Sequence, residues 1–212
     1  MKKRTVEIMD TTLRDGEQTS GMSFSASEKL TITKLLIEEL KVDRIEVASA
    51  RVSQGEFDAV NKITNWAKEN KFLNKIEILT FLDNGISLKW MLKTGAKVQN
   101  LLTKGSLNHL THQIQKTPKQ HFIEISNSIN SAKKEGISTN VYLEDWSNGM
   151  KNSKDYVFEY LDFLTQQPIE RILLPDTLGV LSPSETFCFI SEITNRYPKT
   201  HFDFHAHNDY DL

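Results

Sequence analysis

Cysteine is almost absent from this 212-residue chain, which contains only Cys188. A single cysteine excludes an internal disulfide framework and any zinc site built from several cysteines. The chain also lacks an excess of charge, because 26 basic side chains stand against 28 acidic ones and the formal net charge is −2. No block of lysine or arginine offers a local footprint for nucleic acid, so we expect no nucleic-acid partner.

Long apolar stretches are missing as well. A helix that crosses a bilayer needs ~20 consecutive apolar residues; no segment approaches that length, so we expect no membrane partner. The basic start Met1–Arg4 is followed by no apolar signal segment, which predicts a cytoplasmic protein. Because no low-complexity stretch or linker rich in proline and glycine interrupts the chain, we expect one domain over residues 1–212.

The chain does contain a regular alternation of two patterns. Seven short apolar or β-branched segments predict strands at Val6–Met9, Arg44–Ala48, Ile76–Phe81, Val98–Thr103, Thr139–Leu143, Arg171–Leu174 and His201–Phe204. Six longer amphipathic segments between them predict helices. Helix-capping residues begin four of these segments, at Ser25, Ser53, Thr117 and Ser182. Alternating strands and helices predict repeated βα units and a parallel sheet.

Two α/β architectures fit this alternation, an open doubly wound sheet and a closed (β/α)8 barrel. The GxGxxG fingerprint of dinucleotide-binding sheets does not follow the first predicted strand. That strand leads instead into the polar loop Asp10–Gln18, and barrels carry their chemistry on such loops. A barrel needs eight strands and ~250 residues. Seven strands in 212 residues therefore predict an incomplete TIM (β/α)8-type barrel, truncated at the C-terminus with its last βα unit missing.

Polar side chains gather where the predicted strands end. Asp15 lies in the loop after the first strand, and His205 and His207 lie at the end of the last one. Residues i and i+2 of a strand point to the same side, so the two imidazoles can project together. Two histidines and one carboxylate leave coordination positions open, which suits a divalent ion that must also bind a substrate. The sequence therefore predicts a metal site.

Each of these polar residues also has an interpretation without chemistry. Asp15 precedes Gly16, and the Asp-Gly pair is common in turns. Arg14 can neutralise nearby carboxylates such as Asp10 or Asp176. Glu144 can begin the helix that follows it, and Thr177 can cap a turn. A functional site is favoured because such polar residues recur at the same ends of successive predicted strands.

The remaining histidines and the cysteine carry no motif of their own. We interpret four histidines as surface or packing residues, namely His109, His112, His121 and His201. Cys188 lies within the apolar segment Phe187–Ile190, which predicts a buried small hydrophobic residue.

Two motifs carry a family resemblance. The loop Asp10–Gln18, DTTLRDGEQ, resembles the signature of the metal-dependent acyl-CoA lyases and synthases built on a (β/α)8 barrel. That family includes 2-isopropylmalate, homocitrate and citramalate synthases and hydroxymethylglutaryl-CoA lyase. The segment His205–Asp209, HAHND, resembles its second signature, and the resemblance runs over Val6–Leu212. The segments that look closest to bacterial citramalate synthase are Leu102–Gly105, Asn140–Trp146 and Leu174–Gly179.

The resemblance implies an acyltransferase of branched-chain amino-acid biosynthesis, on the isoleucine or the leucine route. Such an enzyme condenses acetyl-CoA with a 2-oxo acid, pyruvate first among them, and then hydrolyses the thioester. The alternatives are a 2-isopropylmalate synthase, a metal-dependent acyl-CoA lyase and a non-catalytic fragment. The implied cofactors are a divalent ion (Mn, Mg, Zn or Co) and acetyl-CoA as co-substrate. Full-length relatives are homodimers that continue beyond this point, so we expect the chain alone to have little activity.

The resemblance also implies roles for individual residues. The residues that match the metal ligands are Asp15, His205 and His207. Arg14 matches the arginine beside the substrate oxygen, and Thr177 matches a hydroxyl that binds the carboxylate of the 2-oxo acid. Tyr142 matches a residue of the substrate pocket, and Glu144 matches a carboxylate assigned to acid/base work. Asp15, like Arg14, is also expected to contact the substrate.

Apolar residues near the strand ends bear on the size of the substrate. Those expected to line the substrate site are Leu79, Phe81, Leu102 and Tyr142. An apolar lining favours pyruvate or a branched 2-oxo acid over a dicarboxylic one. A distal carboxylate would need a cation, and Lys104 or Arg51 can supply one, so a dicarboxylic substrate stays an alternative.

Overall fold

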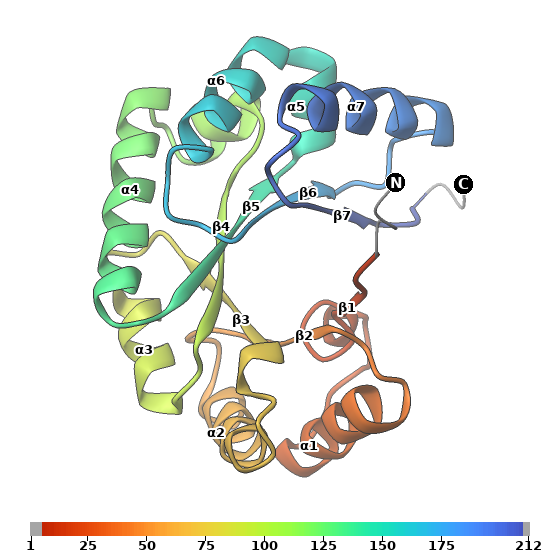
Figure 1. The fold of residues 1–212 in the computed structure, drawn as a ribbon, viewed down its shortest axis with the longest axis vertical. Helices are drawn as coiled ribbons and strands as arrows, with labels where there is room; N and C mark the ends of the chain where they lie inside the picture. Colours follow the sequence, from red (N-terminus) through yellow and green to blue (C-terminus); the bar gives the residue numbers. More distant parts are fainter. Residues whose placement is uncertain (1–5, 210–212) are drawn as a thin grey trace. The chain divides into compact units, whose positions relative to one another are not determined.

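A computed structural model of the chain describes residues 6–209, and the basic start Met1–Arg4 lies outside this range. Its strands are β1 (Met9–Asp10), β2 (Arg44–Ser49), β3 (Ile76–Phe81), β4 (Val98–Lys104), β5 (Ser138–Glu144), β6 (Arg171–Asp176) and β7 (Phe202–Ala206). The strand order follows the sequence, and β1–β2, β2–β3, β5–β6 and β6–β7 pair in parallel. The α-helices are α1 (Ala26–Lys34), α2 (Gln54–Glu69), α3 (Ile86–Thr94), α4 (Pro118–Lys134), α5 (Trp146–Asn152), α6 (Lys154–Leu164) and α7 (Pro183–Arg196) (Figure 1). Parallel strands alternating with helices in this order confirm the incomplete (β/α)8-type barrel.

The chain divides into two compact units, Met1–Asn100 and Leu101–Leu212, called here the N-terminal and C-terminal units. The N-terminal unit contains β1 to β3 and α1 to α3, and the C-terminal unit contains β5 to β7 and α4 to α7. The strand β4 spans the boundary. The expectation of one catalytic domain over residues 1–212 stays a prediction. Within residues 6–209, no helix combines the length and the apolar character needed to cross a membrane.

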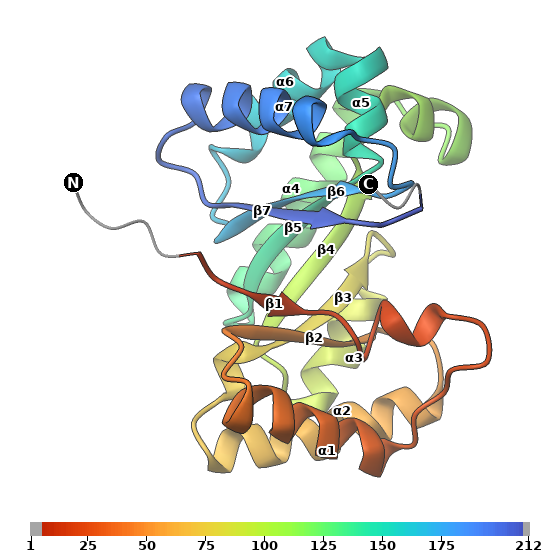
Figure 2. The ribbon, with the colours of Figure 1, turned by 90° about the vertical axis from the view of Figure 1, so that its right-hand side faces the viewer.

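In the N-terminal unit, α1 and α2 pack on one side of β1 and β2 (Figure 2). The residues that α2 buries, spaced three and four apart for the most part, are Ala59, Val60, Ile63, Thr64 and Ala67. The strand residues with no exposed surface include Ile45, Val47, Ile76 and Ile78. Each such side chain contributes about 1.5–3 kcal/mol of hydrophobic stabilisation, so this packing is what holds the loops after β1 and β2.

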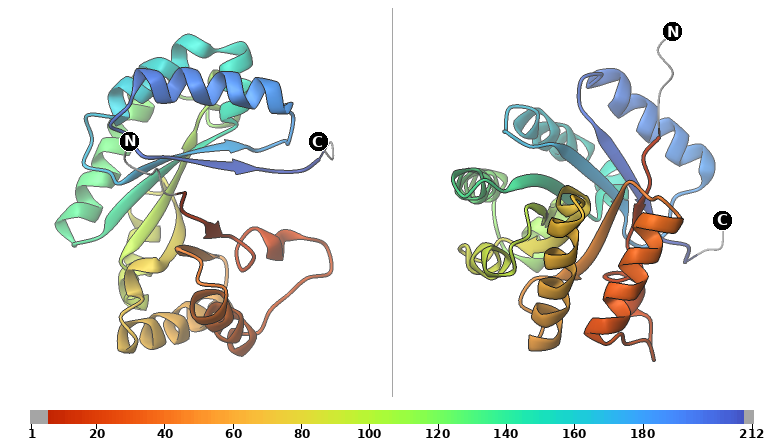
Figure 3. Two further views of the ribbon diagram at one scale, coloured as in Figure 1. Left: turned by 45° about the vertical axis from the view of Figure 1, so that its right-hand side comes forward. Right: turned by 60° about the horizontal axis from the view of Figure 1, so that its bottom comes forward.

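In the C-terminal unit, both faces of β5 and β6 are buried. Adjacent residues of a strand point to opposite faces, and Ile172 and Leu173 are both fully buried, as are Val141 and, at 2% exposure, Tyr142. Burial on both faces is expected of a parallel sheet. Between α4 and α6 lies a stack of rings, in which Phe122 faces Phe163 with centroids 4.7 Å apart and Tyr160 at 5.1 Å. The helix α7 runs alongside β6 and β7 (Figure 3).

The four predicted helix caps are confirmed. Ser25, Thr117 and Ser182 each form a reciprocal capping box, and the Ser53 hydroxyl accepts the Glu56 N–H at 3.1 Å. Each bond satisfies a backbone N–H that the first turn of a helix leaves without a partner.

Two elements differ from the expectation. The first strand is limited to Met9–Asp10, because Val6 and Ile8 are 88% and 62% exposed and so bury no strand face. Between β5 and β6 lie two helices, not one, because the helical backbone is interrupted at Ser153 (φ −148°, ψ 49°). The Ser153 hydroxyl donates to the Gly149 carbonyl at 3.3 Å, and such local side-chain bonds compete with helix formation.

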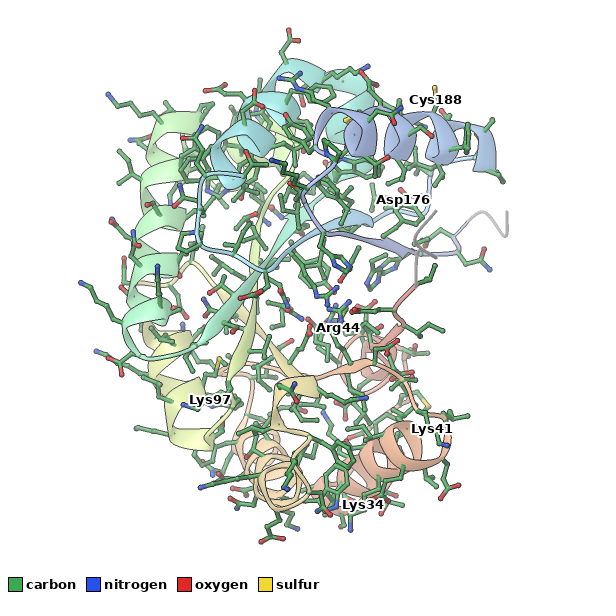
Figure 4. The ribbon with its side chains drawn as sticks, viewed as in Figure 1. Lys34, Lys41, Arg44, Lys97, Asp176 and Cys188 are labelled. Carbon is green, nitrogen blue, oxygen red and sulfur yellow. The ribbon has the colours of Figure 1, made fainter. Side chains whose placement is uncertain are left out.

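The prediction that Cys188 is buried is wrong. Cys188 is exposed on α7 (Figure 4). Its neighbour Phe189 packs edge-on against Trp146, with centroids 6.2 Å apart, whereas Phe187 is 76% exposed. Successive side chains of a helix are rotated by ~100°, so a run of apolar residues cannot all face the core.

Candidate metal and substrate site

The loop after β1 folds back on itself and fixes the backbone of Arg14 and Asp15. The N–H groups of Arg14 and Asp15 donate to the Thr11 carbonyl at 3.1 and 2.7 Å. The Asp10 carboxylate accepts the N–H and the hydroxyl of Thr12, at 2.9 and 3.1 Å. Asp15 then leads into a 3₁₀ turn, Gly16–Gln18. The turn interpretation of the Asp-Gly pair is therefore confirmed, and it is compatible with a ligand role for the Asp15 side chain.

A buried lysine anchors the same loop. Lys29 of α1 is 1% exposed, and its Nζ donates to the Leu13 carbonyl at 3.0 Å. The same Nζ lies 2.5 Å from carboxylate oxygens of both Glu17 and Glu56. Burial raises the pKa of Glu56 in spite of its bond to Lys29. Lys29 thus joins the polar loop to α1 and α2, which limits the movement of Arg14.

Arg14 is held by two carboxylates. Its Nη1 lies 2.5 Å from Asp15 Oδ1, and its Nε donates to Glu46 Oε2. Glu46 of β2 has no exposed surface, and its other oxygen accepts the Asn100 amide at 2.6 Å. Two directional contacts fix the plane of a guanidinium group, so Arg14 is presented in one orientation. Within the N-terminal unit, Asp10 was expected to neutralise Arg14. In the structure, Asp15 and Glu46 pair with Arg14 instead.

Glu46 and Asn100 were not predicted from the sequence. A signal for Glu46 was present, because a carboxylate between Ile45 and Val47 interrupts an otherwise apolar predicted strand. Such a residue lies on the opposite face of the strand from its two neighbours and needs a polar partner when buried. For Asn100 we find no comparable local signal, since its partner lies 54 residues away.

In the C-terminal unit, the ends of β4 and β5 carry an ion pair. Glu144 is the last residue of β5 and pairs with Lys104, the last residue of β4. The two side chains are 21% and 15% exposed. The Gly105 N–H donates to the Glu144 carbonyl at 2.6 Å, which ties the two strand ends together. Glu144 does not begin a helix, because α5 starts two residues later at Trp146.

Buried side chains hold the backbone at Lys104. His121 of α4 is fully buried, and its Nε2 accepts the Lys104 N–H at 3.2 Å. The Tyr156 hydroxyl donates to the Lys104 carbonyl at 2.7 Å. Burial, together with the charges of Lys116 and Lys104, lowers the pKa of His121 from 6.5 to about 4. His121 is thus a neutral packing residue, as expected, and it positions the end of β4.

His121 makes the stability of the protein depend on pH. The histidine of the unfolded chain takes up a proton below pH ~6.5, whereas the folded one resists protonation down to pH about 4. The stabilisation is therefore complete above pH 6.5 and is lost as the pH falls toward 4, by ~3 kcal/mol in all. In denaturant titrations, we expect His121→Gln to reduce this pH-dependence, since glutamine can accept the same N–H without titrating. Equal slopes for wild type and variant between pH 7 and 4.5 would contradict this, and the exposed His201→Gln is the matched control.

The end of β7 presents the two histidines of the second motif. His205 lies within β7 and His207 follows it, with their rings stacked at 5.0 Å between centroids. Tyr142 of β5 meets the His205 ring edge-on at 6.1 Å. The i, i+2 spacing therefore places the two imidazoles side by side, as predicted. Thr177 follows β6, and its Oγ1 accepts the Asp145 N–H at 2.9 Å.

The residues expected to line the substrate site are divided between the units. In the N-terminal unit, Leu79 of β3 is 5% exposed and Phe81 ends the strand half-buried. In the C-terminal unit, Leu102 of β4 is half-buried and Tyr142 is 2% exposed. Asp15 likewise belongs to the N-terminal unit, whereas the two histidines of the ligand set belong to the C-terminal one. The ligand set and the substrate lining stay predictions.

Both candidate cations for a distal carboxylate already have acidic partners. Lys104 pairs with Glu144, as described above. Arg51 pairs with Asp83 at 2.8 Å, and its side chain is 44% exposed. Any anionic substrate group that used either cation would compete with a carboxylate of the protein.

Comparisons with known proteins agree with the family resemblance of the two sequence motifs. The family model described as HMGL-like matches residues 5–212. The chain is 30% identical to a probable 2-isopropylmalate synthase of Ignicoccus hospitalis over 99% of its length. It is 27% identical to a homocitrate synthase of Sulfolobus acidocaldarius over 96% of its length. These alignments cover 50% and 42% of the two relatives, so the chain spans about half the length of the curated relatives that it matches.

A solved structure supports the fold. The HMG-CoA lyase of Bacillus subtilis matches 96% of the chain and 68% of its own chain with a TM-score of 0.77. Only 19% of the aligned residues are identical, so this likeness bears on the fold alone.

Proposed function

Because the chain belongs to the HMGL-like family, we propose that it carries catalytic residues of an acyltransferase. The proposed reaction condenses acetyl-CoA with a 2-oxo acid and then hydrolyses the thioester. The observation that carries this proposal is the oriented pair Arg14 and Asp15 on the loop after β1, in a chain whose β7 presents His205 beside His207. Condensing enzymes among the relatives support the class of reaction.

We assign the metal ligands to Asp15, His205 and His207. The donor set fits a divalent ion, because the imidazoles lie side by side and one carboxylate with two nitrogens leaves positions open for substrate. Such a set accepts Mn, Mg, Zn or Co. When bound, the ion supplies a Lewis acid that polarises the ketone of the 2-oxo acid.

Three further side chains act on the substrates in this proposal. Glu144 removes a proton from the acetyl methyl group, whose carbon then attacks the ketone carbon. Arg14 donates to the ketone oxygen as it becomes an alkoxide, a contribution of about 3–4 kcal/mol for one well-placed donor. The Thr177 hydroxyl donates to the carboxylate of the 2-oxo acid. Glu46 and Lys104 hold Arg14 and Glu144 in place.

For the substrate, we favour pyruvate, which would make the product citramalate and the route that of isoleucine. Support comes from the apolar character of Leu79, Leu102 and Tyr142 and from the ion pairs of Lys104 and Arg51, which make a distal carboxylate unfavourable. The second candidate is the branched 2-oxoisovalerate of leucine biosynthesis. The names of the 2-isopropylmalate synthase relatives favour that reading.

A thiol-release assay tests this proposal. Acetyl-CoA and Mn²⁺ or Mg²⁺ are supplied with pyruvate, 2-oxoisovalerate or 2-oxoglutarate, for this chain and for the product of the gene's full reading frame. We expect metal-dependent release with pyruvate from at least one of the two proteins. Release with 2-oxoisovalerate alone moves the protein to the leucine route, and release with neither protein contradicts the enzymatic proposal.

Shortening Leu102 tests the substrate lining. We expect Leu102→Ala to shift relative kcat/KM from pyruvate toward larger 2-oxo acids by at least ~10-fold, because one methylene group in an apolar pocket is worth about 1–3 kcal/mol. The matched control is Leu101→Ala, since the neighbouring residue lies on the other face of β4 and is fully buried. Unchanged relative kcat/KM values in Leu102→Ala, or equal shifts in the two variants, would refute the assignment of Leu102.

A further inference from the structure

Asp145, which follows Glu144, is a buried carboxylate with partners from two other segments. It is 1% exposed. Its Oδ2 accepts the Ser106 hydroxyl at 2.6 Å and lies 3.5 Å from His109 Nε2. Its Oδ1 accepts the Asn148 side-chain amide at 2.7 Å. The side chain therefore joins the loop after β4 to the first turn of α5.

These contacts hold Asp145 in an unusual backbone conformation. Its φ of 64° and ψ of 26° are left-handed, which few residues other than glycine adopt. Aspartate tolerates this region better than most residues, and here its carboxylate is anchored on both oxygens. With the side chain anchored in this conformation, the Asp145 N–H donates to Thr177 Oγ1 at 2.9 Å.

Close packing around Asp145 leaves its backbone little room to relax. A Cβ added to Gly105 would overlap the Leu143 carbonyl, and one added to Gly149 would overlap the Gly105 carbonyl. The Gly105 N–H also donates to the Glu144 carbonyl at 2.6 Å. Because the loop after β4 is pressed against the end of β5 and against α5, the direction of the Asp145 N–H is set by the fold.

The hydrogen bond from the Asp145 N–H determines whether the Thr177 hydroxyl can donate or accept a further hydrogen bond. A hydroxyl group has one hydrogen to donate and oxygen lone pairs that accept. The Asp145 N–H occupies the accepting side of Oγ1, and the hydroxyl hydrogen meets no acceptor among residues 6–209. The hydroxyl is therefore left as a donor, which suits an anionic oxygen of a ligand.

We propose that Asp145 is a positioning residue for the 2-oxo acid. It acts through Thr177, because its anchored backbone N–H orients the threonine hydroxyl as a donor to the substrate carboxylate. Glu144 directly precedes Asp145 in the chain. The hydrogen bonds of the Asp145 carboxylate therefore also fix the backbone from which the Glu144 side chain projects at the end of β5. This inference rests on the proposed function, which supplies the substrate role of Thr177.

A double-mutant cycle tests this coupling. Asp145→Ala, Thr177→Val and the double variant are compared with wild type in the thiol-release assay, using the protein that shows turnover. We expect Asp145→Ala to raise the KM for the 2-oxo acid by ~10-fold, the size of one hydrogen bond to a charged group. In the Thr177→Val background the same change is expected to raise this KM less than ~2-fold, because coupled residues are not additive. The KM for acetyl-CoA is expected to stay within ~2-fold throughout.

Asp145→Asn is the conservative rescue variant. Asparagine adopts the left-handed conformation and can bond to Ser106 and Asn148 if the Asn148 amide turns over, so we expect a KM within ~3-fold of wild type. A purely structural role would lower the melting temperature and kcat without this selective change in KM. Equal KM increases in both threonine backgrounds would overturn the inference.

Amide hydrogen exchange at Asp145 gives a readout independent of turnover. We expect Thr177→Val to speed exchange of this amide by at least ~10-fold, because the variant removes the acceptor of its hydrogen bond. Unchanged exchange would overturn the inference even with an active enzyme. Failure of wild type to release thiol from any 2-oxo acid refutes the proposed function, and the substrate role of Asp145 with it. The two failures are therefore distinguishable.

Discussion

Replacing His207 by alanine is expected to lower the affinity for the divalent ion by more than ~100-fold and to abolish metal-dependent thiol release. Loss of a residue that merely supports a metal ligand already costs about 10–100-fold, so loss of a ligand costs more. The His207 side chain is exposed, so the fold is expected to tolerate its removal within ~0.5 kcal/mol. Metal affinity is measured directly, by calorimetry with Mn²⁺ or by the visible absorption of bound Co²⁺.

His201→Ala is the matched control for this experiment. His201 is also exposed, at 46% of its side chain, but it precedes β7, whereas His207 follows it. Its partners are Arg171 and Asp203, at 2.6 and 3.5 Å. We expect His201→Ala to bind the ion as wild type does. If His207→Ala retains wild-type affinity, or if both variants lose it equally, the assignment of His207 as a ligand is wrong.

Replacing Glu46 by alanine is expected to cost about 3–5 kcal/mol in the free energy of unfolding, because it removes one of the two carboxylates that hold the buried Arg14. Arg14 is only 10% exposed, and the Asn100 amide would lose its hydrogen bond to Glu46 as well. Without Glu46, the Arg14 guanidinium group is no longer held in one orientation. In the proposed reaction it would then point less accurately at the ketone oxygen that becomes an alkoxide. We therefore expect kcat to fall by ~100-fold or more, as when one preorganised donor is lost.

Glu77→Ala separates these two effects of Glu46. Glu77 pairs with Arg44 at 3.1 Å on the neighbouring strand and is 1% exposed, so its loss is expected to destabilise the protein to a similar degree. Glu77 pairs with Arg44, whereas Asp15 and Glu46 hold Arg14, so kcat is expected to stay within a few-fold of wild type. Stability is measured by denaturant titration, and kcat under conditions where each variant is folded. Equal losses of kcat in the two variants would contradict the positioning role of Glu46.

The sequence by itself determined most of the elements and the positions of the candidate site residues along the chain. Strand and helix periods repeat every few residues, and caps such as Ser25 and Thr117 depend on a residue three positions away. The loop Asp10–Gln18 and the pair His205 and His207 are likewise local, since an i, i+2 spacing fixes the side to which both imidazoles point. Local information of this kind can be read without knowing how the strands pack.

Only the tertiary structure decided which side chains meet. Arg14 meets Glu46, Glu144 meets Lys104 and Asp145 meets Thr177 across separations of 32, 40 and 32 residues. Each contact depends on the register between parallel strands, and a slip of one residue would turn every side chain to the other face. The exposure of Cys188 was decided in the same way, by which face of α7 met the strands. The sequence carries the chemistry of these residues, and the packing of the sheet selects their partners.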